Sequence, residues 1–290
     1  MKGEFYLSNN TNTPKKTLKE LNLLDRFLFA EAMDDPENMK ILLDIILGQN
    51  TDLKHPPQTE KEKRTDPENR MIRLDVYAID SNDTIYNTEA QSTNTHTLPK
   101  RSRFYQGVID SRLLEPGDID FNKMNPLYII MVTPFDLFKK GLYRYTFRMK
   151  CEEMPDIGLG DAATRIFLNT HGTHPELVSP ELIEFLNYME HTTDEVAASC
   201  ESPRIKQMHE RIQAIRNNEQ IGVKYMQQWE EKILEQKENQ EIGRREGLAA
   251  GQEKINLLIS KLSSLGRTDD IIRSASDPAF QQQLLDEFHL

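Results

Sequence analysis

Residues 73–91 have the sequence RLDVYAIDSNDTIYNTEAQ, and the arrangement of the domain can be inferred from them. Two short runs, 71–79 and 84–91, have the alternating side chains of strands, and the polar sequence Ser81-Asn82-Asp83 separates them. Such runs joined by a short turn sequence predict an antiparallel pair of strands. The rest of the chain can be organised outward from this pair.

The position of the turn predicts which residues of the pair lie opposite each other. A turn centred on Asn82 sets Asp75 across from Glu89 and Arg73 across from Gln91. Because side chains alternate along a strand, these four residues share one face, whereas the opposite face is mostly apolar. A slip of one residue would move the two carboxylates out of opposition.

Two carboxylates that face each other across a strand pair repel, and the repulsion grows when water is excluded. A divalent cation between Asp75 and Glu89 would remove this cost, and Mg²⁺ commonly takes one or two carboxylates and keeps several waters. Gln91 would project beside Glu89, where it could orient a water or contact a phosphate oxygen. The alternative is a solvated face that carries acidic residues by chance, since 47 of the 290 residues are acidic.

The flanking sequence predicts an α/β domain over residues 17–195, after a flexible tail at 1–16. Its apolar residues recur with helical spacing in some segments and form short continuous or alternating runs in others. The expected elements are a helix at about 18–33, a second from Asp35-Pro36 to Gly48, a loop at 51–69, a helix at 102–114, a buried strand at 127–132, an edge strand at 142–149, a strand near 164–168 and a helix after Ser179-Pro180.

Residues 196–290 predict a helical C-terminal region. A heptad-like seam in it fits either a helix packed on its own domain or a self-association helix. Three glycines spaced four apart share one helix face and indicate either close helix–helix approach or a frayed hinge. The seam consists of Ile205, Met208, Ile212 and Ile215, and the glycines are Gly243, Gly247 and Gly251.

Composition limits the possible functions. The net charge of −11 argues against a protein that wraps nucleic acid through its whole surface, although residues 98–112 are locally basic. Two cysteines are too few for a disulfide framework or a cysteine-based zinc site, and the histidines have no metal-ligand spacing. No apolar run is long enough for a membrane span or a signal peptide, so we expect a cytoplasmic protein.

Residues 73–91 resemble the second and third strands of the PD-(D/E)XK nuclease superfamily, and more narrowly the Rpn family of recombination-promoting nucleases and transposases. Further similar segments are Leu24 to Phe29, the helix containing Arg101 and Tyr105, and the strand from Leu127 with its exit at Pro134-Phe135-Asp136. The resemblance implies a restriction-endonuclease-like core, a mixed sheet flanked by helices with a helical C-terminal extension. It also implies a DNA endonuclease that uses Mg²⁺ or Mn²⁺.

The same resemblance assigns roles to individual residues. Asp75 and Glu89 correspond to the metal ligands, and Gln91 stands where the wider superfamily has lysine. The first helix of the family often brings an acidic residue to the metal, which here is Asp25 or Glu31. Three basic residues of the helix that follows would bind DNA phosphates, unless they form only a solvated basic face; they are Lys100, Arg101 and Arg103.

Two other classes of function remain open at this point. A DNA-binding or assembly protein could keep the nuclease fold without activity, as the acidic net charge and Gln91 suggest. A scaffold could oligomerise through its C-terminal helices. A homodimer would suit the endonuclease, because cutting both strands of a duplex usually takes two active sites.

Overall fold

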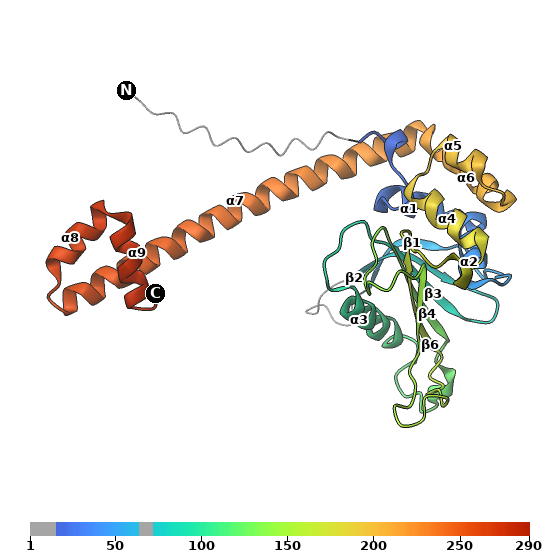
Figure 1. The fold of residues 1–290 in the computed structure, drawn as a ribbon, viewed down its shortest axis with the longest axis horizontal. Coiled ribbons are helices and arrows are strands. Elements are labelled where there is room, and N and C mark those ends of the chain that lie inside the picture. Colours follow the sequence, from blue (N-terminus) through green and yellow to red (C-terminus); the bar gives the residue numbers. More distant parts are fainter. Residues whose placement is uncertain (1–15, 64–71) are drawn as a thin grey trace. The chain divides into compact units, whose positions relative to one another are not determined.

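A computed structural model describes residues 16–63 and 72–290 (Figure 1). The predicted tail at 1–16 lies outside the described residues, apart from Lys16. Within these ranges the chain divides into two compact units, one that extends to Gly222 and one that begins at Val223.

In the described part of the first unit, six strands form one mixed sheet in the order β1-β2-β3-β4-β6-β5. Strands β3, β4 and β6 are parallel, and the other neighbouring pairs are antiparallel. The central strand β4 is buried on both faces, as its continuous apolar run predicted. The strands are β1 (Gln58–Lys63), β2 (Ile72–Ile79), β3 (Ile85–Ala90), β4 (Leu127–Thr133), β5 (Arg144–Phe147) and β6 (Ala163–Asn169).

The first unit also contains the helices that surround the sheet. Those before residue 195 are α1 (Arg26–Met33), α2 (Pro36–Leu47), α3 (Leu98–Asp110) and α4 (Pro180–Glu190). They are followed by α5 (Asp194–Ser199) and α6 (Pro203–Arg216), and short 3-10 turns occur at Leu18–Glu20, Phe121–Lys123 and Pro175–Leu177. The long helix α7 (Glu219–Ser264) leads to α8 (Thr268–Ser276) and α9 (Pro278–Glu287).

The strand registers show which side chains share the sheet face that α3 covers. Directly opposed residues lie on the same face, and one row across the sheet runs through Tyr77, Asn87, Ile129 and Arg165. Apolar residues of α3, including Val108 and Ile109, form one buried cluster with sheet residues such as Tyr77 and Ile129. Glu89, two residues after Asn87 on β3, therefore also points toward the α3 side.

A second layer of helices completes the first unit. Helix α1 packs on β1 and β2, and α2 and α6 pack on α1 and on each other (Figure 1). The apolar seam of α6 is buried in this packing, since Ile205, Met208 and Ile212 have no exposed surface. For these three residues of the seam, packing on their own domain is confirmed, whereas its predicted continuation through Tyr225, Trp229 and Ile233 is only partly buried.

The second unit is built around α7. Its small core comprises Leu258 and Leu262 of α7 and Leu284 of α9. The predicted hinge at the glycines is not formed, because α7 is continuous through Gly243, Gly247 and Gly251. A Cβ added at any of these glycines would meet no atom within 4 Å, so no described helix of this chain approaches closely there.

Three predicted boundaries were wrong. Strand β1 forms inside the predicted loop at 51–69, where its polar sequence QTEKEK has no apolar alternation to reveal it. The first α-helix begins at Arg26 and not near residue 18, because Asp25 accepts a hydrogen bond from the N–H of Phe27 and caps the helix there. Helix α3 begins at Leu98, ahead of the predicted 102, with Pro99 in its first turn.

Candidate active site

Asp75 and Glu89 lie beside each other under α3, as the turn position predicted. The ladder between β2 and β3 pairs Val76 with Thr88, which is the register of a turn centred on Asn82. The backbone N–H of Asp75 donates a hydrogen bond to Oε1 of Glu89 at 3.1 Å. Both acids are almost fully buried, with exposed fractions of 3% and 1%. The alternative of a solvated acidic face is therefore wrong for these residues.

Each buried carboxylate has an arginine of its own. Nε of Arg26, at the start of α1, lies 2.9 Å from Oδ1 of Asp75. Nη2 of Arg101, on α3, lies 2.9 Å from Oε2 of Glu89. The two guanidinium groups come from helices far apart in the sequence, and they offset the repulsion between the acids in a site from which water is largely excluded.

The environment raises the pKa of Glu89 above its ordinary value. Burial is the main cause, and the negative charge of Asp75 adds to it, whereas Arg101 acts in the opposite direction. The nearby Tyr105 responds to the same field: burial, and then the charge of Glu89, raise the pKa of its hydroxyl to about 12. Acids with raised pKa values beside a second acid are common at functional sites and also occur in structural ion-pair networks.

Gln91 and Arg101 form one hydrogen-bonded group at the edge of the site. Nη1 of Arg101 donates to Oε1 of Gln91 at 2.8 Å, while the amide nitrogen of Gln91 donates to the carbonyl oxygen of Thr93. The guanidinium also lies over the ring of Tyr105, 5.3 Å from its centroid. Arg101 thus places a fixed positive charge next to Glu89, close to the position where a lysine at residue 91 would have supplied one.

The remaining predicted residues lie around this centre. Asp25 is half-buried and caps α1 one residue before Arg26. Glu31 is half-buried further along the same helix. Lys100 and Arg103 are exposed on α3, on either side of the inward-facing Arg101. The predicted pairing of Arg73 with Gln91 involves a side chain outside the described ones.

A scan of known protein families identifies the chain. Residues 26–240 match the family described as PD-(D/E)XK nuclease family transposase. The chain belongs to this family. No curated protein and no solved structure matches it. The mixed sheet with flanking helices and the helical C-terminal part are the α/β PD-(D/E)XK fold that the resemblance implied.

The donors at the centre of this family member suit a hard divalent cation. Asp75 and Glu89 supply carboxylate oxygens, and Oδ1 of the neighbouring Asn87 is buried without a hydrogen-bond partner among the described residues. Oxygen ligands of this kind, completed by waters, are what Mg²⁺ prefers. In the part of the chain that the structure describes, no three His, Cys, Asp or Glu residues are grouped to hold a metal; Asp75 and Glu89 are two acids that lie together at this centre.

Sequence reasoning missed two contributors to this site. Arg26 follows Asp25 directly, and only the fold reveals that its side chain reaches Asp75. Asn87 lies on the same face of β3 as Glu89, and its unpaired acceptor depends on surroundings that only the fold reveals. None of the helices in the described ranges is long and apolar enough to cross a membrane.

Proposed function

We propose that this chain is a metal-dependent DNA endonuclease that hydrolyses phosphodiester bonds and acts in DNA recombination or in the movement of mobile elements. The observation that supports it best is the buried pair of Asp75 and Glu89, each matched by its own arginine under α3. Membership of a nuclease family makes hydrolysis of DNA the natural chemistry for such a pair.

In this proposal Asp75 and Glu89 hold Mg²⁺ or Mn²⁺. The cation supplies charge stabilisation at the phosphodiester and an acidified water. Arg26 and Arg101 hold the acids in place before the cation binds, and Arg26, which is 48% exposed, has room to withdraw. Gln91 orients the attacking water through its amide. Asp25, which is not grouped with the two acids in the described structure, would have to turn from its helix cap to supply a third carboxylate.

The basic residues of α3 would hold the substrate. Lys100 and Arg103 are exposed on either side of Arg101, so their charges can reach phosphates. Arg101, which the sequence predicted as a third phosphate contact, is paired with Glu89 and is not part of this proposed contact. This arrangement answers the objection from the net charge of −11, since a few local cations suffice to position DNA over the site. We also propose a cytoplasmic location.

A plasmid-cleavage assay tests the proposal. Wild-type protein, Asp75→Ala and Glu89→Ala are incubated with supercoiled plasmid, with Mg²⁺ or Mn²⁺ and with a chelator. We expect cutting that requires the metal and is lost in both variants. Metal-dependent cutting by Asp75→Ala at the wild-type rate would rule the assignment out.

A second candidate is a DNA-binding protein that keeps the fold without activity. It is favoured by one observation, that Arg26 and Arg101 already satisfy both carboxylates without a metal. Thermal unfolding with increasing Mg²⁺ discriminates between the two. A cation bound only to the folded state at 100 times its Kd adds about 2.7 kcal/mol of stability. No metal-dependent shift, together with salt-sensitive DNA binding, would favour the inactive protein.

We further propose that the endonuclease acts as a homodimer. Apolar side chains of α7, such as Val223, Leu234 and Leu248, are exposed in this chain and could contact a second copy. The solution mass of the full chain, measured over a range of concentrations, tests this. A monomer at all concentrations would leave each molecule able to cut only one strand at a time.

A further inference from the structure

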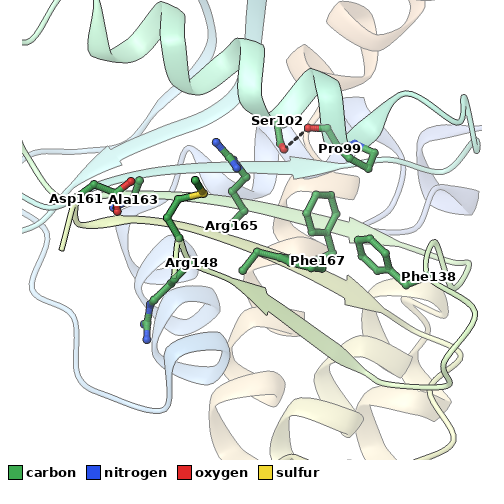
Figure 2. Close-up of a pocket in the computed structure, with 10 residues that line it drawn as sticks. Pro99, Ser102, Phe138, Arg148, Asp161, Ala163, Arg165 and Phe167 are labelled. Atoms are coloured by element: carbon green, nitrogen blue, oxygen red, sulfur yellow. Dashed lines mark hydrogen bonds between the residues drawn. The ribbon is translucent and has the colours of Figure 1, made fainter. Parts of the chain in front are cut away.

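A pocket outside the acidic centre lies on the same side of the sheet. It has a volume of about 260 Å³ and is formed between the first turns of α3 and the strands β5 and β6 (Figure 2). Its walls combine aromatic rings with a few polar groups. The lining residues are Pro99, Ser102, Phe138, Phe147, Arg148, Met149, Asp161, Ala163, Arg165 and Phe167.

Three phenyl rings form the apolar wall of the pocket. Phe138 lies 4.9 Å from Phe147 and 5.4 Å from Phe167, measured between ring centroids. Phe147 and Phe167 meet edge to face at 5.8 Å. Phe147 remains 41% exposed, so one ring is available at the mouth to a flat guest.

Arg165 supplies the polar part of the pocket. Its Nη2 donates to Oε1 of Gln106 at 2.5 Å, which fixes the guanidinium beside α3. Its Nε is buried and has no hydrogen-bond partner among the described residues. Figure 2 shows the side chain of Arg165 rising toward α3, whereas Arg148 points to the other side of the sheet. The guanidinium of Arg165 is the cationic group of the lining that lies on the α3 side, and it can meet an acceptor of a bound molecule.

The strand registers place this pocket close to the acidic pair. Glu89 is paired with Met131 of β4, and Met131 with Phe167 of β6, so the three lie in one row across the sheet. Adjacent strands are about 4.8 Å apart, so Glu89 and Phe167 are separated by about 10 Å. Helix α3 borders both places, through Arg101 at the acids and Ser102 at the pocket.

We propose that the pocket receives an unpaired nucleobase of the DNA strand, and that the enzyme therefore prefers DNA with unpaired nucleotides next to the point of cleavage. The inference rests on the proposed endonuclease function and deepens it by naming the class of substrate. A base is flat enough to stack on the phenyl rings, and its ring nitrogens and carbonyl oxygens are acceptors for the guanidinium of Arg165. The volume is near the lower end for ligand pockets, which suits a single ring system.

The surroundings of the pocket favour a nucleic acid strand over a neutral apolar guest. Lys100 and Arg103 are exposed on α3, each next in sequence to a lining residue, Pro99 or Ser102, and Lys139 and Lys140 are exposed directly after Phe138. These cations can hold the phosphates on either side of the inserted base. Asp161 is the exposed acid of the lining, and it belongs to the loop before β6.

The test is binding measured by fluorescence anisotropy in a chelator, so that no cleavage is needed. Three labelled probes are compared: a fully paired duplex, the same duplex with a single-stranded bulge, and the bulged duplex with abasic sites in place of the unpaired nucleotides. We expect the bulged probe to bind at least tenfold more tightly than its abasic version, a difference of about 1.4 kcal/mol. Equal binding of these two probes would overturn the proposal.

Variants of the pocket locate the effect. Phe147→Ala removes the exposed ring, Ala163→Leu fills the cavity and Arg165→Met removes the free donor. Each should abolish the preference for the base and leave the affinity for the paired duplex unchanged. Phe104→Ala is the matched control, because Phe104 is a 45% exposed ring on α3 that does not line the pocket. If all three variants still prefer the base-containing bulge over the abasic bulge, the assignment of the pocket is contradicted. It is also contradicted if the variants lose the preference only because their solution mass has changed.

The outcome is separable from that of the proposed function. A protein that prefers the base-containing probe but never cuts DNA would contradict the endonuclease and support the pocket. A protein that cuts plasmid through Asp75 but binds both bulged probes equally would support the endonuclease and contradict the pocket.

Discussion

The backbone N–H of Asp75 donates to the side chain of Glu89, so the strand of one acid holds the carboxylate of the other. The contact needs only the backbone of residue 75 and survives when that side chain is changed. The position of Glu89 is therefore independent of the charge of Asp75, whereas its ionisation is not, because Asp75 raises the pKa of Glu89. Geometry and charge at this site can be perturbed separately.

Replacing Asp75 with asparagine should remove activity and spare the fold. Asparagine keeps the shape and the backbone hydrogen bond but cannot supply an anionic ligand, so we expect plasmid cleavage to fall by more than about 100-fold. The melting temperature should change by only a few degrees, because the repulsion with Glu89 disappears and the half-exposed Arg26 can return to water. Asp118→Asn, at an acid paired with Lys123 outside the acidic pair, is the control and should cut normally.

Stability without metal should depend on pH through Glu89. The pKa of this carboxyl is raised above 4.5 in the folded protein, so the folded state holds its proton more tightly than the unfolded state. Its contribution to stability is fully present below pH 4.5 and is lost as the pH rises toward the raised pKa. Melting curves of wild type and Glu89→Gln in a chelator measure this. The wild type should lose stability relative to the variant as pH rises, and parallel curves would contradict the raised pKa.

Arg101→Ala should change both the stability of the protein and its cleavage of DNA, although the side chain of Arg101 is partly exposed. The variant deprives Glu89 of its closest cation and Gln91 of a donor, so the pKa of Glu89 should rise further. We expect a lower melting temperature at alkaline pH, largely restored by millimolar Mg²⁺, and cleavage reduced by at least about tenfold. Arg101→Lys should recover part of both. An alanine variant with wild-type stability at all pH values would show that the ion pair is dispensable.

Lys100 and Arg103 should act on binding alone. Both are exposed and hold no part of the acidic centre, so Lys100→Ala/Arg103→Ala should melt like the wild type. If each side chain contacts one phosphate, the slope of log affinity against log salt should fall by about 1.8 in the double variant. Titrations of metal-free protein with duplex DNA at several salt concentrations measure the slope. An unchanged slope would mean that α3 presents only a solvated basic face.

The centre of the fold could be predicted from local pattern, but much of its surroundings could not. Turn residues around Asn82 fix the register of β2 and β3, which suffices to bring Asp75 and Glu89 together. The partner of Asp75 comes from a helix 49 residues earlier, and no periodicity reveals that Arg26 reaches it. Strand β1 was missed because it is polar, and its pairing is supplied by the backbone of β2. The phenyl pocket joins residues from 99 to 167, so it exists only once the sheet order is known.

The proposed role of Asp25 as a third carboxylate can be tested separately from its role as the cap of α1. Its carboxylate accepts from the N–H of Phe27, and its neighbour Arg26 binds Asp75, so the start of α1 lies against the acidic pair. Asparagine caps a helix about as well as aspartate, whereas alanine costs about 1 kcal/mol. Asp25→Asn should therefore melt like the wild type and yet cut plasmid at least about tenfold more slowly, if Asp25 supplies the third carboxylate as proposed. Asp25→Ala should lose both stability and cutting, and Glu31→Gln should change neither. Full cutting by Asp25→Asn would reduce Asp25 to a cap, and loss of cutting in Glu31→Gln would transfer the third carboxylate to Glu31.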